Sequence, residues 1–448
     1  MLQTVGVRTG FSDFVLDVTP DDIPPDVRAR AQDLVLDLIG VAAAAAPLDA
    51  SRIGREMALR LFNTPDAGVP MLFDGRTASA AGAAYAGATQ IDALDAHDGY
   101  SPSKGHAGCG LLPGVLAFLA GQPPLSGADF LTAMVVGYET ACRAGVALHG
   151  TVTDYHTSGA WVALAVAGLG VRLAGGTPDQ LRQAIGIAEY HGPRSQMMRE
   201  IDNPTMLHDG SGWGAMVGVT SADLALAGFQ GAPAVTVERE DAAPYWADLG
   251  QTWLTARQNI KLYPICRWAH AQIKAALDLR TEHGVAADQI ERIELFGFHE
   301  AIRLAADMPV TTAKAQYSIS YPVACALHFG RVGTREVSGE TFGDPAVADL
   351  VARTTLAACD QCNANFPADR LGRTVLVLKD GRRLDSGITR APGEHTNPID
   401  RDGIIAKFDD LTAPVLSRDR AERIKDTVFA LDGMATVGDL MTLIHEVP

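Results

Sequence analysis

The spacing of apolar positions predicts helices over most of the first 230 residues. Apolar residues recur at helical intervals from Val27 to Ala46 and from Phe130 to Leu148, as on helices with one or more buried faces. The same pattern predicts further helices over residues 51–61, 78–91, 111–120, 157–173, 178–188 and 213–227. Thr177 before Pro178 is a helix start with a cap and a proline in the first position. This part of the chain is therefore expected to be a helical body.

The pattern changes after about residue 265. Residues 289–298 alternate in part and predict a strand, and Asp380-Gly381 within 373–389 predicts a hairpin turn. Predicted helices lie between them (269–280, 321–329, 344–353), and residues 400–447 are helical again. The predicted fold class is mainly α with an α+β part. A large all-helical domain is built from both chain ends (1–267 and 396–448), with a smaller α+β lid domain at 268–395.

Composition supports a large core and narrows the classes of partner. The 448 residues are 47% hydrophobic and 20% charged, with a net charge of -16. Such an acidic chain is not expected to bind nucleic acid or an anionic membrane surface. No apolar run reaches the ~20 residues that span a bilayer, and residues 1–19 lack the pattern of a signal peptide. We therefore expect a cytoplasmic protein whose six cysteines are free thiols.

One polar stretch interrupts the helices more sharply than any other. Residues 95–110 read Asp-Ala-His-Asp-Gly-Tyr-Ser-Pro-Ser-Lys-Gly-His-Ala-Gly-Cys-Gly, between two long apolar runs. A loop this polar is expected to face solvent, a cleft or a ligand rather than the core. Aspartate and histidine side by side are common equipment for proton transfer. A solvated turn with satisfied side chains is the plainer alternative for any single residue.

Three other interruptions carry titratable groups. They are residues 149–159 at a helix start, the polar loop 190–212, and residues 260–270 at the predicted domain boundary. Helix starts bind carboxylates, and pockets favour domain boundaries. Arg194, Arg199, Lys261 and Arg267 would place positive charge there, as recruitment of a small polyanion requires.

No cofactor or metal is predicted. His97, Asp98 and His106 suggest a ligand set but lack the tight spacing of a helical metal site. Gly168 and Gly170 lie inside a helical run rather than after a strand, so a dinucleotide fold is not expected. Cys359 and Cys362 form only half of a zinc motif.

Taken together, these motifs resemble those of the MmgE/PrpD family, which includes 2-methylcitrate dehydratase, cis-aconitate decarboxylase and iminodisuccinate epimerase. The resemblance covers nearly the whole chain. It is carried, in order, by Asp95–Gly108, His156-Thr157-Ser158-Gly159, Lys261-x-Tyr263-Pro264 with His270, Ser318-Ile319-Ser320-Tyr321, Pro392-Gly393 through Asn397-Pro398, and Lys407-Phe408. It implies the two-domain fold above, a homodimer, and an active site between the domains that works without a metal or organic cofactor.

The resemblance also implies roles for particular residues. Asp95, His106, His156, Lys261 and Tyr321 match residues that line the family's site, with Lys261 as base or carbanion stabiliser and His156 or Tyr321 as the opposing acid or base. Asp95 would orient His106. Five further residues are expected to bind the substrate, with the arginines gripping its carboxylates: Arg194, Arg199, Arg267, His97 and His270.

Two departures from the family pattern bear on the reaction. Eliminating members typically have Asp-Asp-Thr where this chain has His97-Asp98-Gly99, and Lys-Pro-Leu-His where it has Thr205-Met206-Leu207-His208. We therefore expect an epimerase of a small di- or tricarboxylate that removes a proton next to a carboxylate. The alternative is a hydro-lyase or decarboxylase of a citrate-like acid. A non-catalytic polyacid-binding protein and a metal-dependent hydrolase are remoter alternatives.

Overall fold

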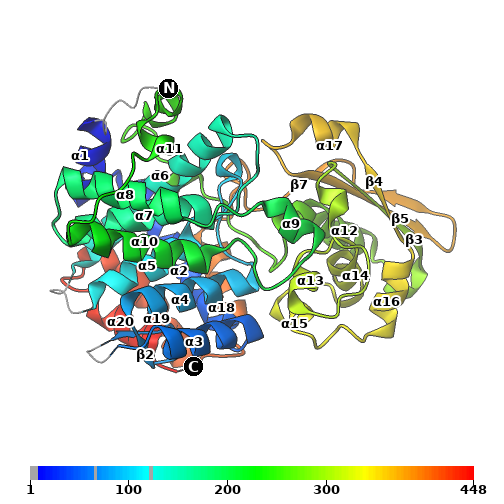
Figure 1. The fold of residues 1–448 in the computed structure, drawn as a ribbon. Coiled ribbons are helices and arrows are strands. Elements are labelled where there is room, and N and C mark those ends of the chain that lie inside the picture. Colours follow the sequence, from blue (N-terminus) through cyan, green and yellow to red (C-terminus); the bar gives the residue numbers. More distant parts are fainter. Residues whose placement is uncertain (1–8, 65–67, 121–124, 448) are drawn as a thin grey trace.

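The protein is described by a computed structural model that covers residues 9–64, 68–120 and 125–447. Figure 1 shows two bodies, one made of helices and one that contains a sheet. Residues 1–8 lie outside the described residues, so the expectation that no signal peptide is present rests there on sequence alone. Among the described residues, no single helix is long and apolar enough to cross a membrane, although α2 and α3 together form one bent pair that meets those criteria.

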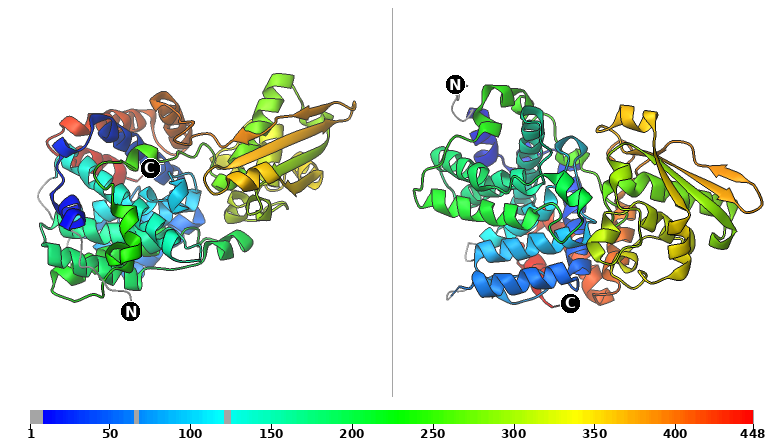
Figure 2. Two further views of the ribbon diagram at one scale, coloured as in Figure 1. Left: turned by 90° about the horizontal axis from the view of Figure 1, so that it is seen from above. Right: turned by 45° about the vertical axis from the view of Figure 1, so that its right-hand side comes forward.

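The helical body is formed by both ends of the chain (Figure 2). Its main helices are α1 (Thr9–Asp17), α2 (Pro25–Ala45), α3 (Asp49–Leu61), α4 (Ala80–Leu94), α5 (Gly108–Leu119), α6 (Gly127–Thr151), α7 (Gly159–Leu173), α8 (Pro178–His191), α10 (Ser211–Leu226), α18 (Arg401–Thr412), α19 (Arg418–Ala430) and α20 (Gly438–His445). The C-terminal helices α18 and α19 pack against α2. This arrangement confirms the predicted fold class.

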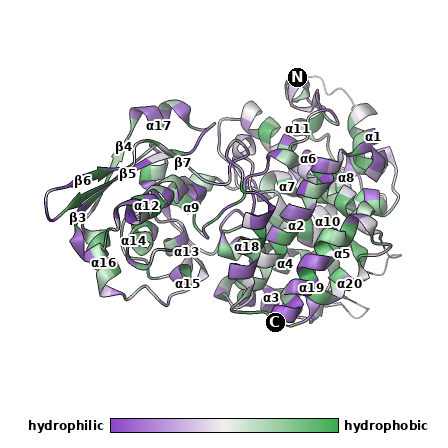
Figure 3. Cartoon of the chain, turned by 180° about the vertical axis from the view of Figure 1, so that it is seen from behind, coloured by the Kyte–Doolittle hydropathy of each residue, from purple (hydrophilic) through white to green (hydrophobic). Residues whose placement is uncertain are grey.

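Local sequence explains where several helices begin. Thr177 caps α8 as predicted, and its hydroxyl accepts from Gln180 N while the Gln180 side chain accepts from Thr177 N. Ser79 caps α4 and Asp400 caps α18 in the same way. In Figure 3 the exposed helix α19 is more hydrophilic than α5, α7 and α10, which pack on one another inside the helical body.

The smaller body holds a mixed sheet. Its strands are β3 (Ile290–Gly297), β4 (Thr354–Ala358), β5 (Leu371–Leu378), β6 (Arg383–Asp385) and β7 (Thr389–Arg390). The order is β4-β3-β5-β6, with β4 parallel to β3, β5 antiparallel to β3, and β7 paired with the start of β5. The helices α12 (His270–His283), α13 (Thr312–Gln316), α14 (Ser320–Phe329), α15 (Thr334–Val337), α16 (Pro345–Ala352) and α17 (Asp360–Asn365) accompany it. The predicted hairpin at Asp380-Gly381 is confirmed, with Gly381 at φ +90°.

Some elements differ from the sequence predictions. The stretch 190–212 is not wholly a loop, because α9 (Met197–Asp202) forms inside it and lies between the two bodies in Figure 1. Strand β4 and helix α1 were not predicted, since both are short. The six cysteines are all free, as predicted. The domain boundaries at 267/268 and 395/396 stay predictions.

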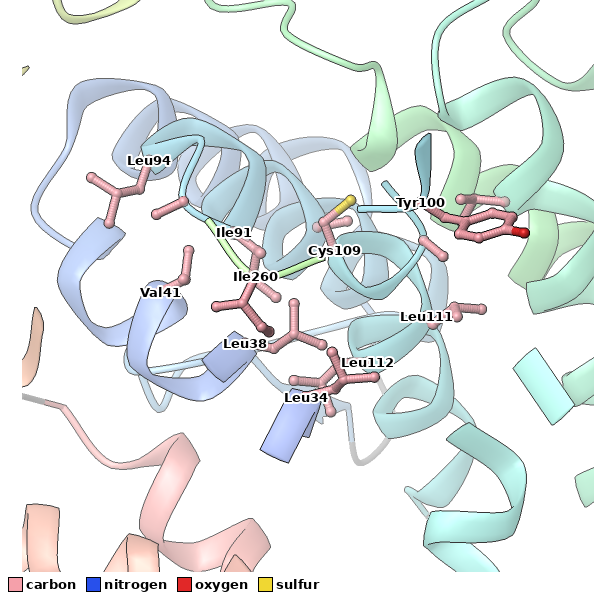
Figure 4. Close-up of a cluster of buried hydrophobic side chains, with 14 of the residues drawn as sticks. Leu34, Leu38, Val41, Ile91, Leu94, Tyr100, Cys109, Leu111, Leu112 and Ile260 are labelled. Atoms are coloured by element: carbon pink, nitrogen blue, oxygen red, sulfur yellow. The ribbon is translucent and has the colours of Figure 1, made fainter. Parts of the chain in front are cut away.

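A hydrophobic cluster supports the polar loop from below (Figure 4). It joins side chains of α2, α4 and α5 to Ile260, which lies next to Lys261. Leu38, Ile91, Leu112 and Ile260 are each fully buried. Packing of this kind fixes side-chain positions to within a fraction of an ångström, so the polar groups above it are held rigidly.

Candidate active site

A cavity lies where the two bodies meet, and the stretch 95–106 forms much of its wall. It contains about 560 Å³ of empty space, its open mouth included. Residues 259–268, α9, Tyr317 and Arg370 complete the lining. The lining holds four cationic side chains and two carboxylates, namely Lys104, Lys261, Arg267 and Arg370 with Asp95 and Asp209. In a protein of net charge -16, this local excess of positive charge favours an anionic ligand.

The polar stretch is only in part a cavity wall. Asp95 ends α4 in the left-handed conformation, at φ +53°, which aspartate tolerates better than most residues. Gly99 then pairs through its backbone with Asn259. His97 and Asp98 are fully buried behind the wall. The prediction that the whole stretch faces solvent or a cleft is therefore wrong for these two residues. His97 contacts Asp92 Oδ1 and Asp98 O, and Asp98 Oδ2 accepts from Gly108 N at 3.4 Å.

Lys261 and Asp95 form a buried ion pair at the base of the cavity. Lys261 Nζ donates to Asp95 Oδ1 and, at 3.1 Å, to Asp95 O. Both side chains are about 2–3% exposed. Burial raises the pKa of Asp95, and the Lys261 ammonium opposes that shift. Asp95 thus holds Lys261 rather than His106, which corrects the predicted pairing.

His106 is oriented by a backbone carbonyl. Its Nδ1 lies against Asp98 O, so the proton is on Nδ1 and Nε2 is left as an acceptor. Nε2 lies 3.8 Å from Asp209 Oδ2. Burial, reinforced by the charge of Lys261, lowers the pKa of His106 well below its usual range. His106 is therefore a neutral base at physiological pH.

Asp209 comes from the polar loop 190–212 and is fixed at the start of α7. Its Oδ1 accepts from Ser158 Oγ at 2.6 Å and from Ser158 N at 3.2 Å. Ser158 Oγ in turn accepts from His106 N at 2.9 Å. Two predicted functional segments are thereby joined through one serine, and the carboxylate stays beside the imidazole.

Asp92, His97 and Cys109 lie close enough together to share a metal ion. His97 Nε2 is 3.2 Å from Asp92 Oδ1, and Asp92 Oδ2 accepts from Ser211 N. Cys109 donates to Ser211 Oγ at 3.1 Å. Burial lowers the pKa of His97 to about 3. These hydrogen bonds satisfy the cluster without an ion, and the expectation of a metal-free site stays a prediction.

The structure places Tyr317, not Tyr321, in the cavity wall. Tyr321 lies in the first turn of α14 and points into the smaller body, where its hydroxyl contacts Glu336 O at 2.7 Å and Thr341 Oγ1 at 2.6 Å. Tyr317 precedes α14 and is fully buried, and its hydroxyl makes no hydrogen bond within the described part of the chain. Burial raises the pKa of Tyr317 well above its usual range, so the phenol stays protonated. The role predicted for Tyr321 stays a prediction, and in this structure its hydroxyl is engaged by Glu336 O and Thr341 Oγ1 instead of the cavity.

Three more predicted residues lie away from the cavity. His156 is absent from its lining, and His156 Nδ1 is 3.3 Å from Arg194 O. Arg194 is exposed, as is Arg199, which borders a separate hollow beside Glu200. Arg199 is turned outward because α9 forms within the predicted loop and buries Met197, Glu200 and Ile201 instead.

Arg267 lies in the cavity wall, where a substrate-binding role requires it, and His270 lies directly behind Arg267. Arg267 lines the cavity and pairs with Glu394, with 3.1 Å between Nη2 and Oε1. His270 is fully buried, with Nε2 3.0 Å from Ile265 O and Nδ1 3.4 Å from Arg267 Nη1. His97 likewise supports His106 from behind, with ring centroids 4.5 Å apart.

The cavity wall also contains residues that were not predicted as site residues, among them Asp209, Tyr317 and Arg370. Asp209 ends a loop that was singled out, and Tyr317 lies one residue before the motif at Ser318, so the signal was close to both. Arg370 precedes a strand with no polar motif around it. Only the fold brings it to the cavity.

Gly99 is where eliminating family members have a threonine. A Cβ on Gly99 would come within 2.9 Å of His106 Nδ1 and 3.2 Å of Gly105 O. The imidazole therefore occupies the space that a larger side chain would need.

A two-body helical fold with a cation-rich cavity at the junction defines the class of protein. The MmgE/PrpD N-terminal domain matches residues 9–248, and the MmgE/PrpD C-terminal domain matches residues 263–432. The chain belongs to the MmgE/PrpD family, as the sequence predicted.

The chain is similar to three curated members of the family along most of its length. It is 26% identical to the cis-aconitate decarboxylase-like protein oryM of Aspergillus oryzae, over 98% of this chain and 97% of the relative. It is 25% identical to a cis-aconitate decarboxylase of Aspergillus terreus, over 98% and 96%. It is 24% identical to the human cis-aconitate decarboxylase, over 81% and 79%. These names favour the hydro-lyase or decarboxylase alternative over the predicted epimerase.

Proposed function

We propose that this chain is a cofactor-independent lyase of a small di- or tricarboxylate, and that it decarboxylates a cis-aconitate-like acid. One observation carries the proposal: the cavity lining holds four cationic side chains against two carboxylates, in an acidic protein. A polycarboxylate is the kind of ligand that such a lining attracts. The printed names of the relatives supply the reaction type.

Lys261 has the central role in this proposal. Decarboxylation breaks the bond between a substrate carbon and its carboxylate, CO₂ leaves, and the electron pair stays on the substrate. A fixed ammonium stabilises that developing negative charge without having to reorganise. The ion pair with Asp95 fixes the ammonium in place.

A proton must then reach the substrate carbon. Tyr317 is the proposed donor, because its phenol is protonated and its hydroxyl is free to reach a ligand. The resulting phenolate would be reprotonated from solvent, and the raised pKa of Tyr317 favours that return of the proton. Lys261 is the alternative donor.

His106 has a different place in the scheme. Its neutral Nε2 accepts a hydrogen bond or a proton but has none to give. A decarboxylation needs no base, so His106 would bind and orient the substrate. Dehydration and epimerisation begin with removal of a proton next to a carboxylate, and there His106 would be the base.

The experiment that tests the proposal is proton NMR in deuterium oxide with cis-aconitate, citrate, 2-methylcitrate and iminodisuccinate. Release of CO₂ from cis-aconitate, with new vinyl signals, is the expected result. A new alkene from citrate or 2-methylcitrate would indicate a dehydratase. Deuterium wash-in with inversion of iminodisuccinate would restore the epimerase, which the absence of a threonine at Gly99 and of a lysine at Thr205 favours.

Two further properties remain proposals. The family resemblance implies a homodimer, which sedimentation velocity would test against the 47.3 kDa of one chain. A cytoplasmic location and the lack of nucleic acid or membrane partners rest on composition alone.

A further inference from the structure

Arg370 is held by the smaller body at the edge of the cavity. It directly precedes β5, is 5% exposed, and lines the cavity together with Lys261 and Tyr317. Beyond residue 270, only Tyr317 and Arg370 of the described residues contribute to this lining. Arg370 therefore presents the one guanidinium that reaches the site from the sheet.

Few protein groups use the guanidinium of Arg370. Its one hydrogen bond to the described residues runs from Nη1 to Pro367 O. The group lies over the ring of Phe366, 5.6 Å from the centroid, and Phe366 stacks on Phe298 at 4.3 Å. Arg370 Nε is buried and has no hydrogen-bond partner. The stack fixes the plane of the guanidinium, while most of its donors stay unused.

Other buried arginines among the described residues have more protein partners than Arg370 has. Arg55 pairs with Asp74 and Arg143 pairs with Asp248. Arg420 has no carboxylate partner but donates to three backbone carbonyls of the C-terminal segment. Full pairing is the usual rule for buried charge, because an unpaired buried ion is costly.

The nearest candidate partner of Arg370 is already in use. Glu394 acts electrostatically on Arg370, but its ion pair is with Arg267, at 3.1 Å. Burial lowers the pKa of Arg370, and the Glu394 carboxylate opposes that shift only in part. The fold thus leaves one buried cation in the cavity without a carboxylate of its own.

We propose that Arg370 is the specificity residue that binds a second carboxylate of the substrate, one that does not react. A guanidinium held in a fixed plane with free donors suits the paired oxygens of a carboxylate. The proposal rests on the polycarboxylate function above. It adds that the ligand connects the two bodies, because Lys261 is paired with Asp95 of the helical body and Arg370 directly precedes β5 of the sheet.

This role gives Arg370 two measurable signatures. First, the preference of the enzyme for ligands with more carboxylates depends on it. Second, Arg370 does not stabilise the fold of the ligand-free protein, since its charge has no carboxylate partner. A purely structural arginine would stabilise the ligand-free fold.

The test measures binding of tricarballylate, a saturated tricarboxylate, and of glutarate, which lacks the central carboxylate, by calorimetry. The proteins are wild type, Arg370→Met and Arg370→Lys. Arg390→Met is the matched control, because Arg390 lies on the paired strand opposite Leu371, beside Arg370, but outside the cavity lining, and makes an exposed pair with Asp369 at 2.8 Å. Thermal melting of each protein is recorded with and without tricarballylate.

Arg370→Met is expected to weaken tricarballylate binding by about 10- to 100-fold, as loss of charge-assisted hydrogen bonds does. The difference in affinity between tricarballylate and glutarate should be smaller in this variant than in wild type. Its melting temperature without ligand should be unchanged or higher, and the ligand-induced rise should be lost. Arg370→Lys should bind tricarballylate with intermediate affinity, because lysine keeps the charge but lacks the paired N–H donors of a guanidinium. Arg390→Met should match wild type.

Three results would overturn the inference in distinguishable ways. Tight tricarballylate binding by wild type and by Arg370→Met alike would remove the role of Arg370 and leave the proposed function standing. Absence of binding of either acid to wild type, together with no turnover of cis-aconitate, would overturn the proposed function and this role with it. A lower melting temperature of ligand-free Arg370→Met, with unchanged ligand preference, would make Arg370 a structural residue.

Discussion

The two walls of the cavity handle charge in opposite ways. On the helical side, Lys261 is paired with Asp95, and Asp209 is fixed by Ser158. On the side of the smaller body, Arg370 has no carboxylate partner and Tyr317 has a free hydroxyl. Lys261, Asp95 and Asp209 of the helical wall are paired without a ligand, and Lys104 lies over the ring of Tyr155, whereas the other wall offers unused donors close to the cavity. A preorganised wall suits chemistry and an unsatisfied wall suits binding.

The largest expected effect comes from breaking the ion pair of the helical wall. Lys261→Met should lower turnover by at least about 10³-fold, because the charge that stabilises the carbanion is lost. It should also destabilise the fold by roughly 3–5 kcal/mol, since Asp95 is left buried and unpaired. Turnover of cis-aconitate and urea unfolding measure the two effects.

A double variant separates those effects. Lys261→Met with Asp95→Asn removes both charges, and asparagine tolerates the left-handed backbone at this position. Stability should recover while turnover stays lost. Recovery of turnover in the double variant would show that Lys261 serves only to neutralise Asp95.

On the opposite wall, Tyr317→Phe should lower kcat by about 10²-fold, as loss of one aimed donor does. Tyr321→Phe is the matched control, because its hydroxyl contacts Glu336 O and Thr341 in the smaller body. This control should keep its activity and lose about 1–2 kcal/mol of stability. The reverse pattern would reinstate Tyr321 as the proton donor.

A smaller effect is expected at His106, and its size reports the reaction. If the enzyme is a decarboxylase, His106→Gln should cost about tenfold, the value of a lost hydrogen bond to substrate. A loss near 10³-fold would show that the reaction begins with proton removal. His156→Gln, outside the cavity, should be silent. Because the pKa of His106 is lowered, the neutral form should persist and kcat/KM should hold below pH 6.5.

The smallest effect on turnover is expected at Asp98, behind the helical wall, where the change is one of stability. Burial, aided by the nearby Asp37 carboxylate, raises the pKa of Asp98 to about 7 from an ordinary 3.8. Between these values the folded protein holds a proton that the unfolded chain has released, so stability falls as pH rises. Asp98→Asn should remove on the order of 2–3 kcal/mol of that fall between pH 5 and pH 8. Urea unfolding of both proteins at the two pH values measures it, and equal slopes would contradict the assignment.

The two walls of the cavity also differ in how far they could be predicted from the sequence. Helices with long apolar periods and the Asp380-Gly381 hairpin were predictable because their signals are local. Lys261, Asp95, His106 and Arg267 were found because they lie in polar interruptions of that pattern. The helical wall is thus largely encoded in short motifs.

The wall formed by the smaller body is not encoded in short motifs. Arg370 reaches the cavity only because β5 pairs with β3 and places its first residues against Phe366, a long-range arrangement without a local signature. Tyr317 and Tyr321 are four residues apart, and only the start of α14 at Ser320 decides which hydroxyl faces the ligand. His156 shows the converse, since it belongs to a motif but turns toward Arg194 O.

The close contact between Gly99 and His106 restricts how this site can change over generations. A threonine at position 99 would collide with an imidazole that Asp98 O holds in place. The single substitution Gly99→Thr should therefore cost activity unless His106 has first moved or been replaced. The histidine-bearing and threonine-bearing versions of the site are then separated by an ordered, two-step mutational path, and lineages on either side should exchange only by taking those steps in sequence.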